Sequence, residues 1–328
     1  MSRSEPITIV GATGLVGREL VGILIELGVE RDQLVLAASD AGTMAVDGVD
    51  VPVLPMSDDL PLGELVFMCV IAQVARRWVP IALEANCTVI DHSSAFRIDE
   101  AAALIVPGVN DDACGTDARL IAVPNCTTII LLTAITPVLS TFDVTAVNVA
   151  TYQAVSGAGR GGMESLQRES RGEERMPESI FPEPCVGNVF RHESPIDPHT
   201  GFNGEETKVI DESHRILARP DLAIMPTCMR VPVERVHTEV ITLRIDGDVT
   251  VDGVLEALCC GQHITVIDAP TALKAAGGDD VLVGHVRVQH HGDHSLVSLV
   301  ACGDQLRIGA ALTAVRLAAS ANMLGHEG

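Results

Sequence analysis

The run Ile7-Thr8-Ile9-Val10-Gly11-Ala12-Thr13-Gly14-Leu15-Val16-Gly17 joins a β-branched stretch to a helical pattern that continues through Leu20, Leu24 and Leu27. Glycines in such a run let the backbone turn tightly and approach a pyrophosphate group, which then lies at the N-terminus of the helix. An ordinary tight turn is the alternative, but the preceding strand and the following helix favour a dinucleotide site. The residues predicted to hold that cofactor are Gly11, Thr13, Gly14, Leu15, Val16 and Gly17.

Strand and helix patterns alternate along the chain outward from this run. Apolar β-branched runs predict strands, and apolar residues three to four apart predict helices. The predicted strands are 33–38, 65–70, 88–91 and 120–123, and the predicted helix among them is 73–85. This order is typical of an α/β fold with a doubly wound, mostly parallel Rossmann-type sheet, which we assign to residues 1–125.

The second half has a different order of elements, which predicts a second domain of the α+β class over residues 126–305. Its predicted elements, with the last helix of the chain, are a helix from 126 to about 139, a strand at 144–154, a flexible glycine turn at 156–162, strands within 223–245 and 281–301, and a helix at 310–323. Residues 168–203 are polar and proline-rich, so we expect a long loop there. We expect residues 306–328 to pack back onto the first domain.

The composition of the 328-residue chain excludes several classes of partner. Its formal net charge is −22, which argues against a nucleic-acid or anionic-membrane partner. No apolar run reaches the roughly 18 residues of a membrane-spanning helix. Nine cysteines without C-x-x-C spacing, and no charged and apolar leader at the start, indicate a reducing cytoplasm and free thiols. We therefore expect a soluble cytoplasmic protein that acts on a small molecule.

The end of the second predicted strand bears on the choice of dinucleotide. An acidic residue there binds the ribose 2′-hydroxyl of NAD, whereas a basic residue accepts the 2′-phosphate of NADP. The strand is followed by Ser39-Asp40, and no Lys or Arg occurs from Asp32 to Ala75. NAD is therefore favoured over NADP, with Ser39 and Asp40 as predicted cofactor residues, although an arginine from elsewhere in the chain could reach a 2′-phosphate.

Cys126 lies between a predicted apolar strand and a predicted apolar helix, in the sequence Ala122-Val123-Pro124-Asn125-Cys126-Thr127-Thr128. Unpaired N–H groups and the positive end of the helix dipole lower the pKa of a thiol at this position, which favours the nucleophilic thiolate. A cysteine taken alone is more often a buried structural thiol. We assign that role to the other eight cysteines.

Six motifs, in order along most of the chain, make the sequence similar to the aspartate-semialdehyde dehydrogenases. They are the glycine run from Gly11 to Gly17, Ser93-Ser94-Ala95-Phe96-Arg97, Pro124-Asn125-Cys126-Thr127-Thr128, Tyr152-Gln153-Ala154-Val155-Ser156-Gly157-Ala158-Gly159, Glu205-Glu206-Thr207-Lys208, and Arg230-Val231-Pro232-Val233 followed by His237. No single motif is specific, but the combination is. The resemblance implies an NAD(P)-dependent phosphorylating aldehyde dehydrogenase, which reduces L-aspartyl-4-phosphate to L-aspartate 4-semialdehyde in lysine, threonine and methionine biosynthesis.

The resemblance also implies a role for each site residue and a second domain that forms a homodimer or tetramer. The implied roles are nucleophile for Cys126, positioning of the acyl intermediate for Gln153, general acid/base for His237, α-carboxylate binding for Arg230, ammonium binding for Glu205, and phosphate binding for Arg97, Asn125 and Lys208. Ser156 and Gly157 join the predicted cofactor residues, and no catalytic metal is implied. A β-aspartyl phosphate has a carboxylate, an ammonium and an acyl phosphate, and this set offers each an opposite charge.

The implied chemistry is covalent. Cys126 displaces phosphate from the acyl carbon to give a thioester, and hydride from the reduced nicotinamide then gives the semialdehyde. Backbone N–H groups at the start of the helix after Cys126 are expected to stabilise the oxyanion. An imidazole such as that of His237 suits proton transfer at the developing oxygen near neutral pH.

Several of these residues have plainer interpretations. Glu205 and Lys208 are three apart on a probable helix, and on most proteins such a pair is only a surface ion pair. Glu206, one helical step further on, is the other candidate for binding the ammonium. Arg97 could cap a strand end or pair with Asp99 instead of binding phosphate.

The spacing of Arg230 and His237 predicts a bend in the chain. Residues seven apart lie on opposite faces of a regular strand. Pro232 disfavours an uninterrupted central strand, and a bend there would bring both side chains to one pocket.

Three histidines close together in the sequence could bind a metal ion: His290, His291 and His294. Gly292-Asp293 lies between two alternating runs, however, and this pattern is typical of a hairpin turn. We therefore predict an exposed turn and no metal site there.

Two related enzymes and one noncatalytic class remain as rival interpretations. Glyceraldehyde-3-phosphate dehydrogenase needs a histidine a few tens of residues after its cysteine, and residues 127–191 contain none. N-acetyl-glutamyl-phosphate reductase matches less well around Cys126 and has no need of an ammonium-binding Glu205. A noncatalytic nucleotide-binding homologue is disfavoured because the implied nucleophile, acid/base and substrate residues occur together.

Overall fold

The computed structural model describes residues 6–113, 115, 118–321 and 323–324. They form two compact units. Unit 1 comprises the described residues up to Pro124 together with those from Ala310 onward, and unit 2 is Asn125–Gly309. Residue 322 of the predicted last helix and residues 325–328 of the predicted C-terminal segment lie outside the described residues.

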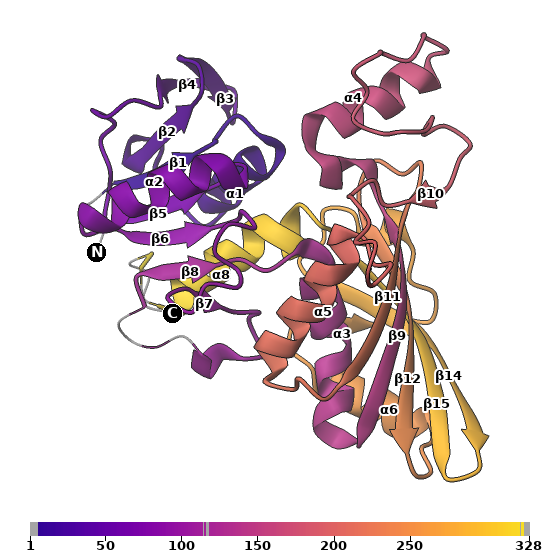
Figure 1. Ribbon diagram of the computed structural model, residues 1–328. Helices are drawn as coiled ribbons and strands as arrows, with labels where there is room; N and C mark the ends of the chain where they lie inside the picture. Colours follow the sequence, from indigo (N-terminus) through magenta and orange to yellow (C-terminus); the bar gives the residue numbers. More distant parts are fainter. Residues whose placement is uncertain (1–5, 114, 116–117, 322, 325–328) are drawn as a thin grey trace. The chain divides into compact units, whose positions relative to one another are not determined.

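Unit 1 is built on an eight-stranded sheet in the order β3-β4-β2-β1-β5-β6-β8-β7 (Figure 1). Every neighbouring pair is parallel except β3 with β4. Its strands are β1 (Ile7–Val10), β2 (Leu34–Ala38), β3 (Gly42–Val46), β4 (Val49–Pro55), β5 (Leu65–Met68), β6 (Thr88–Asp91), β7 (Ala103–Leu104) and β8 (Leu120–Ala122). The prediction of an α/β fold with a doubly wound, mostly parallel sheet is confirmed.

The helices of unit 1 follow the apolar periodicity of the sequence. They are α1 (Leu15–Glu26), α2 (Ala72–Glu84) and α8 (Leu312–Ser320), with 3-10 turns at η1 (Arg31–Gln33) and η2 (Asp111–Ala113). α8, from the end of the chain, packs against α1, and α2 packs against β5 and β6. Because helices cover the sheet, β1 and β5 are buried along their whole lengths, which explains why both are continuous apolar runs.

The hairpin β3–β4 was not predicted. Its strands join through Asp47-Gly48, and both residues have positive φ, 48° and 75°. That conformation suits the primed turns that connect antiparallel strands, and Asp-Gly is a strong signal for them. The hairpin extends the parallel sheet beyond β2 at the edge where Ser39 and Asp40 lie.

Unit 2 is built on a seven-stranded mixed sheet in the order β10-β11-β9-β12-β15-β14-β13. Its strands are β9 (Val144–Gln153), β10 (Phe190–Arg191), β11 (Ala223–Arg230), β12 (His237–Asp246), β13 (Ile264–Val266), β14 (Val281–His291) and β15 (His294–Gly303). Its helices are α3 (Cys126–Thr141), α4 (Gly159–Ser170), α5 (Gly204–Leu217), α6 (Val251–Cys259) and α7 (Ala272–Ala275), with a 3-10 turn at η3 (Val155–Ala158). A π-helical turn, η4 (Arg307–Ala311), follows β15.

The two faces of this sheet differ in burial. Alternate residues of β9, β11, β12 and β15 are buried, and α3, α5 and α6 pack on the sheet (Figure 1). The intervening residues are half-buried or exposed, including Tyr152 and Met225, and we call them the outer face. The short helix α7 packs on the outer face at one end of β15, against Val300 and Cys302. The active-site candidates described below lie at the ends of strands on the helix-covered face.

The glycine segment 156–162, predicted to be a flexible turn, is ordered instead as η3 followed by the first turn of α4. A Cβ added at Gly162 would lie 2.2 Å from the carbonyl oxygen of Val155. The glycine therefore serves close packing of the helix on the preceding turn, and flexibility is not its role.

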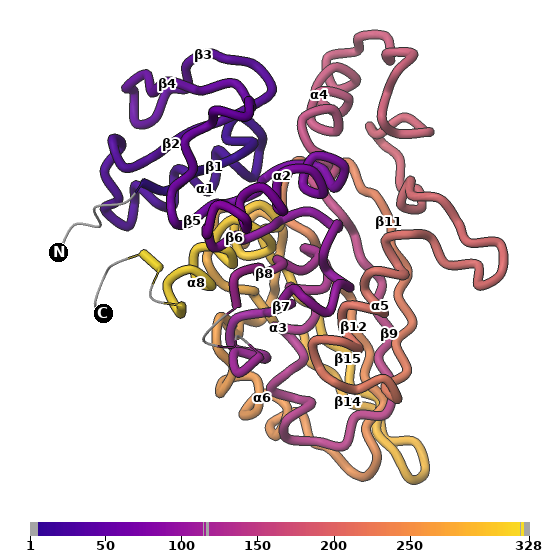
Figure 2. Tube along the Cα trace, turned by 60° about the vertical axis from the view of Figure 1, so that its left-hand side comes forward, coloured from indigo at the N-terminus to yellow at the C-terminus, as the bar shows by residue number. Residues whose placement is uncertain are grey.

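The predicted loop 168–203 is largely irregular but contains elements that were not predicted. Its first residues complete α4, and β10 pairs antiparallel with β11 further on. Phe181 and Cys185 are buried with Val155 and Leu166 in a small apolar cluster. Figure 2 shows the segment as a long excursion beyond α4, and the pairing of β10 with β11 returns it to the sheet. We call residues 171–203 the excursion; Phe181 and Cys185 anchor it to the apolar residues of η3 and α4.

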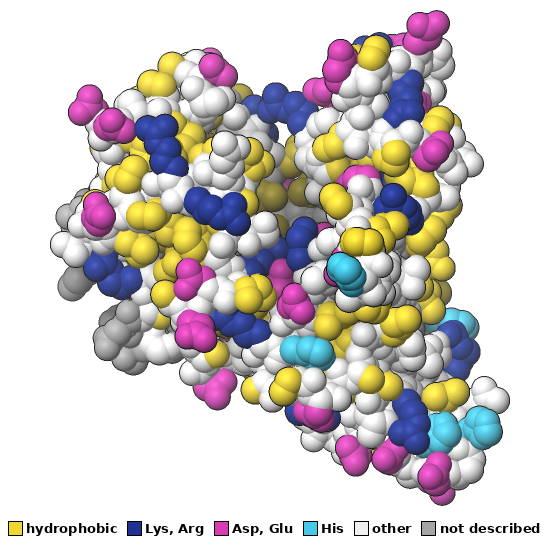
Figure 3. Space-filling view, viewed as in Figure 1, with side chains coloured by type: hydrophobic (Ala, Val, Ile, Leu, Met, Phe, Trp, Pro, Cys, Tyr) yellow, Lys and Arg dark blue, Asp and Glu magenta, His cyan; other side chains and the backbone are white. Residues whose placement is uncertain are grey.

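The histidines near the end of β14 lie at a hairpin turn, as predicted. β14 ends at His291, β15 begins at His294, and Gly292 has a φ of +65°. Histidine side chains are visible at the tip of this hairpin in Figure 3. Among the described residues no cluster of His, Cys, Asp and Glu could hold a metal ion.

Two further expectations concern the whole chain. Eight cysteines are free thiols, as predicted, and the ninth, Cys114, lies outside the described residues. The expectation that all cysteines other than Cys126 are buried is wrong for Cys259 and Cys260, which are exposed near the end of α6. Within the part of the chain that the structure describes, no helix is long and apolar enough to cross a membrane.

Candidate active site

Cys126 is the first residue of α3 and is half-buried. Asn125 caps this helix: its Oδ1 accepts hydrogen bonds from the backbone N–H groups of Thr127 at 2.9 Å and Thr128 at 3.4 Å. The expectation that these N–H groups are unpaired and available to an oxyanion is therefore wrong. Gly309 lies against the thiol-bearing residue, since a Cβ added there would be 3.1 Å from Cβ of Cys126.

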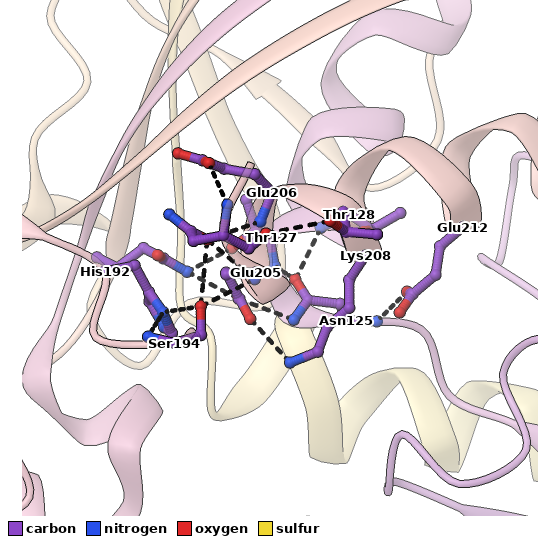
Figure 4. A network of polar contacts seen from close by, with 12 residues as sticks. Asn125, Thr127, Thr128, His192, Ser194, Glu205, Glu206, Lys208 and Glu212 are labelled. Atoms are coloured by element: carbon purple, nitrogen blue, oxygen red, sulfur yellow. Dashed lines mark hydrogen bonds and ion pairs between the residues drawn. The ribbon is translucent and has the colours of Figure 1, made fainter. Parts of the chain in front are cut away.

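Glu205 lies in a buried network that joins three elements of unit 2 (Figure 4). Its Oε1 accepts hydrogen bonds from Nδ2 of Asn125 at 2.9 Å and Nε2 of Gln153 at 3.1 Å, and its Oε2 pairs with Nζ of Lys208 at 3.0 Å. The residue is only 4% exposed. The alternative of a plain surface ion pair therefore does not hold.

The ionisation of Glu205 follows from these partners. Burial by itself raises the pKa of the carboxyl, but the charge of Lys208 and the hydrogen bonds from Asn125 and Lys208 outweigh burial and hold the pKa well below its usual range. Glu205 is thus a buried carboxylate with its charge retained. Such a group suits a cationic ligand, because the attraction between opposite charges is stronger in the low-dielectric protein interior than in water.

Glu206, the alternative to Glu205, is held by the backbone. Its Oε2 accepts from the N–H of Asn203 at 2.9 Å in a capping box, and its Oε1 accepts from the N–H of Cys228 at 3.0 Å. Oε2 therefore caps α5, and Oε1 ties α5 to β11. The side chain of Glu205 points instead toward Asn125 and Lys208 (Figure 4).

Gln153 ends β9 and links the network to the helix that carries the thiol. Its Nε2 donates to Oγ1 of Thr127 at 2.7 Å as well as to Glu205. Its Oε1 is buried and has no hydrogen-bond partner among the described residues. The amide is thus fixed beside the first turn of α3 with one acceptor unused.

Arg230 ends β11 and is 1% exposed. Its Nε and Nη2 bind the two carboxylate oxygens of Glu193 at 3.2 and 2.7 Å, and its Nη1 donates to the carbonyl oxygen of Ala154 at 2.8 Å. The guanidinium also lies over the ring of Phe181, 5.3 Å from its centroid. The implied carboxylate-binding residue is therefore already paired with a carboxylate of the chain.

His237 begins β12, so Pro232 and the residues around it connect two strands and bend the chain as predicted. A Cβ added at Gly157 would lie 3.2 Å from Nε2 of His237 and 3.3 Å from Nη1 of Arg230. Both side chains thus reach the same glycine. The predicted convergence of Arg230 and His237 is confirmed.

The imidazole of His237 is fully buried and neutral at physiological pH. Burial, followed by the charge of Arg230, lowers its pKa to about 3. Nδ1 accepts a hydrogen bond from the backbone N–H of Ala154 at 3.1 Å, so the proton of the neutral ring is on Nε2. Nε2 has no hydrogen-bond partner among the described residues.

The residue before His237 is held in a strained conformation. Val236 has a φ of +82°, which a β-branched residue rarely adopts. Its N–H donates to Oε1 of Gln305 at 2.7 Å, and Nε2 of Gln305 also donates to Oγ of Ser156. Ser156, predicted to bind cofactor, is therefore tied to the turn that carries His237.

The predicted cofactor residues of unit 1 form the loop between β1 and α1. Gly11 has a φ of +85°, and a Cβ on it would be 2.2 Å from the carbonyl oxygen of Cys69. Gly14 is the N-cap of α1 and provides no side-chain cap, and a Cβ on Gly17 would be 2.3 Å from the carbonyl oxygen of Gly11. The loop and the helix start therefore fit a dinucleotide pyrophosphate. Thr13, Leu15 and Val16 lie in the same loop and first turn.

The other two positions of interest in unit 1 lie beyond the ends of strands. Ser39 and Asp40 follow β2 and are exposed, and Oγ of Ser39 donates to Oδ2 of Asp40 at 2.9 Å. Arg97 is buried, and donates from Nε to the carbonyl oxygen of Val123 and from Nη2 to that of His92, each at 2.9 Å. These carbonyls follow β8 and β6, so Arg97 does cap strand ends.

Sequence reasoning missed four residues that contact the site. Glu193 pairs with Arg230, Phe181 lies under it, Glu212 accepts from the N–H of Asn125 at 2.6 Å, and Gln305 holds Val236. Glu212 is seven residues after Glu205 on α5, and this helical repeat could have revealed it. The other three carry no local signal, because tertiary folding alone brings them to the site.

Comparisons with known proteins agree with this geometry. Residues 6–116 match the family model described as semialdehyde dehydrogenase, NAD binding domain, and residues 135–308 match semialdehyde dehydrogenase, dimerisation domain. The aspartate-semialdehyde dehydrogenase of Synechocystis sp. is 35% identical over 95% of this chain and 96% of its own length. Aspartate-semialdehyde dehydrogenase 2 of Vibrio cholerae is 33% identical over 97% of this chain and 98% of its own.

A solved structure supports the same relationship. The crystal structure of aspartate semialdehyde dehydrogenase II from Vibrio cholerae complexed with ASA has a TM-score of 0.89 and 30% identity, and covers 97% of this chain and 98% of that one. Fold, site and matches together define an NAD(P)-dependent oxidoreductase of the phosphorylating aldehyde dehydrogenase class. The chain belongs to the aspartate-semialdehyde dehydrogenase family. The rival dehydrogenases and the noncatalytic class are not favoured by these matches.

Proposed function

We propose that this chain reduces L-aspartyl-4-phosphate to L-aspartate 4-semialdehyde, a step in lysine, threonine and methionine biosynthesis. The observation that carries the proposal is the half-buried thiol of Cys126 at the start of α3, one residue from the network of Asn125, Glu205 and Gln153. The names of the matching relatives support the same substrate.

The charges of unit 2 suit the ends of this substrate. Glu205 is a retained buried carboxylate and suits the α-ammonium, whereas Arg230 suits the α-carboxylate. Lys208 uses one N–H on Glu205 and has others for the phosphate, and Asn125 has a second amide N–H.

The reaction needs a nucleophile and a stabilised oxyanion. The Cys126 thiolate attacks the acyl carbon, the bond to phosphate breaks, and a thioester remains. A reduced nicotinamide dinucleotide held at the loop from Gly11 to Gly17 would supply the hydride that this carbon receives. As the intermediate collapses, the C–S bond breaks, which releases the semialdehyde and returns the electron pair to Cys126 as thiolate.

His237 is proposed to donate a hydrogen bond from Nε2 to the oxygen that becomes negative. The step from thioester to semialdehyde and thiolate balances without a proton, so a neutral donor suffices. The low pKa of His237 and its Nδ1 contact with Ala154 support this role over that of a general base. The amide of Gln153 would position the acyl group beside Thr127.

NAD is the proposed cofactor in preference to NADP. The exposed carboxylate of Asp40 follows β2, where a ribose 2′-hydroxyl is bound in this fold. Arg31, the nearest basic residue before this position in the chain, is paired with Asp47 at 3.1 Å. Gly11 to Gly17, Ser39, Ser156 and Gly157 complete the proposed cofactor site.

A homodimer is proposed to form through the outer face of the seven-stranded sheet. This face presents alternate residues of four adjacent strands, among them Tyr152 at 38% and Met225 at 57% exposure. The match to a dimerisation domain over residues 135–308 supports the assignment. Pairing of such dimers would give a tetramer. The free thiols and the biosynthetic reaction support a cytoplasmic location.

The experiment that tests the function is phosphate-dependent oxidation of L-aspartate 4-semialdehyde, followed as reduction of NAD. The wild type is expected to turn over only with phosphate present, and Cys126→Ser to lose turnover. Cys259→Ser, which changes an exposed cysteine at the end of α6, is the matched control and should behave as the wild type. Substantial turnover by Cys126→Ser would show that the nucleophile is elsewhere.

A further inference from the structure

The contact between Arg230 and Glu193 has the geometry of a bound carboxylate. Both oxygens of Glu193 face the Nε–Nη2 edge of the guanidinium, at 3.2 and 2.7 Å. Paired N–H groups on one edge are how arginine binds the carboxylate of a ligand. Three of the five N–H donors of Arg230 are engaged, two by Glu193 and one by the carbonyl oxygen of Ala154.

A carboxylate ligand of Arg230 therefore meets Glu193 by either route. On the Nε–Nη2 edge it must displace the side chain of Glu193. At the remaining N–H groups it lies beside a second negative charge, which disfavours its binding. Arg230 itself is fixed by Ala154 and by the ring of Phe181, so Glu193 is the partner that moves.

Glu193 is held less firmly than its partner. It is 17% exposed as a side chain, against 2% for Arg230, and it lies two residues after the two-residue edge strand β10 in the excursion. Among the described residues its carboxylate has one other titratable group within ion-pair distance, Nε2 of His192 at 3.7 Å. Burial lowers the pKa of His192, so this imidazole is neutral near pH 7 and adds little attraction.

We propose that Glu193 is an internal competitor for Arg230, which occupies the α-carboxylate position of the empty site and is displaced when substrate binds. The inference rests on the proposed function in one respect, that Arg230 receives a carboxylate of the substrate. Exchange of one carboxylate for another keeps the buried guanidinium paired throughout, because an unpaired buried charge is strongly disfavoured.

The proposal has a quantitative consequence for affinity. The apparent affinity for substrate is the intrinsic affinity multiplied by the fraction of molecules in which Glu193 has left Arg230. If this fraction is about one in ten, the apparent affinity is about tenfold weaker than the intrinsic affinity. Glu193 thus sets the substrate concentration at which the enzyme responds. It is a specificity-determining residue as well, since a ligand without a carboxylate cannot replace it.

The opposite interpretation is that Glu193 anchors the excursion and helps to hold Arg230 in place. Removal of the charge would then loosen the site, and affinity for substrate would fall. The two interpretations predict changes of opposite sign. Glu193→Gln keeps the size and polarity of the side chain, and Glu193→Ala serves as a second variant should the amide be poorly accommodated.

The test measures binding and turnover in the full-length enzyme. Calorimetry with L-2-aminobutyrate, which has an α-ammonium and an α-carboxylate but no reactive carbonyl, reports on Arg230 without catalysis. The KM for L-aspartate 4-semialdehyde is measured at saturating NAD and phosphate. Glu183→Gln, which changes an exposed carboxylate of the excursion, is the matched control.

We expect L-2-aminobutyrate to bind Glu193→Gln about tenfold more tightly than the wild type. The variant should also have a lower KM for the semialdehyde and a kcat within about twofold of the wild type. Glu183→Gln should show no change. Unchanged or weaker binding to both Glu193 variants, or no binding to any form of the enzyme, would overturn the proposal. Failure of the proposed function is distinguishable, because it appears as absent turnover in the wild type while the binding measurement still reports on Arg230.

Discussion

The backbone N–H of Ala154 donates a hydrogen bond to Nδ1 of His237 at 3.1 Å. This single contact fixes the tautomer of a buried imidazole, because the other nitrogen must then carry the proton of the neutral ring. It connects the end of β9 with the start of β12. In the proposed function this contact directs the Nε2–H of His237, as a hydrogen-bond donor, toward the reacting oxygen.

Substitution of His237 distinguishes a donor from a proton-transfer group. Glutamine can place an amide N–H near the position of Nε2, whereas alanine cannot. We expect His237→Ala to lower kcat by about 100- to 1,000-fold, the usual effect of losing one oxyanion donor, and His237→Gln to retain a substantial part of the activity. Steady-state kinetics of the two variants provide the comparison.

The pH profile is the control for this assignment. Since burial and Arg230 lower the pKa of His237 to about 3, the imidazole stays neutral above that value and should cause no inflection of kcat near 6.5. An inflection near 6.5 that disappears in His237→Gln, together with equal loss of activity in both variants, would restore the general acid/base role.

Glu205 and Glu206 provide a second matched pair. Glu205→Gln removes the charge proposed to bind the ammonium, and we expect KM for the semialdehyde to rise by about 10- to 100-fold, as for loss of a charged hydrogen bond. Glu206→Gln keeps an oxygen for the capping N–H of Asn203 but loses the acceptor for the N–H of Cys228, so it should lower stability and leave KM unchanged. Kinetics at saturating cofactor decide between them. A rise in KM with Glu206→Gln alone would reverse the assignment.

Asp40 is expected to set the preference between the two dinucleotides. In Asp40→Asn the carboxylate no longer repels a 2′-phosphate or accepts from a 2′-hydroxyl, so we expect the ratio of kcat/KM for NAD to that for NADP to fall by about tenfold or more, ~1.4 kcal/mol. Asp59→Asn, another exposed carboxylate of unit 1, is the control. A wild-type enzyme that strongly prefers NADP would contradict the proposed cofactor.

Glu239 should make the stability of the protein depend on pH. It lies two residues after His237, is fully buried, and neither of its carboxylate oxygens has a partner among the described residues. Burial raises its pKa well above the ordinary value of 4.5. The folded protein keeps this proton where the unfolded chain loses it, so the contribution to stability is full below 4.5 and is lost as pH rises toward the folded pKa.

Glu239→Gln tests this expectation through urea unfolding at several pH values. Relative to the variant, the wild-type free energy of unfolding should fall as the pH rises above 4.5, by up to ~1.4 kcal/mol per pH unit. Other titrating groups are common to both proteins and cancel in the difference. Parallel curves for the two proteins would mean that Glu239 is ionised or paired in the folded state.

The parallel sheet of unit 1 could be predicted because its buried strands are continuous apolar runs. The glycines of the loop after β1 occupy positions where a side chain would not fit. Gly11 requires a positive φ, and Gly17 allows helix and strand to approach closely. The β3–β4 hairpin was equally predictable from Asp47-Gly48 but was missed. Elements without such signals, such as the two-residue strand β10, depend on pairing with distant strands.

The site could be predicted in part. Motifs identified the residues that meet at Arg230, His237 and Glu205, but not what those residues contact. Asparagine before a helix is a strong N-cap, so the engagement of the Thr127 N–H by Asn125 was readable from the sequence and was overlooked. The Glu193 contact was not readable, because an irregular excursion brings the carboxylate back to the sheet and no local pattern encodes that path.

The proposed reaction requires an acyl-enzyme on Cys126, which mass spectrometry can detect. The enzyme is incubated with L-aspartate 4-semialdehyde and NAD in the absence of phosphate, quenched in acid and digested. An aspartyl thioester on the peptide that contains Cys126, absent in Cys126→Ser and removed by added phosphate, is the predicted result. Turnover by the wild type without any such adduct, or with an adduct on another cysteine, would show that Cys126 is not the acylated nucleophile.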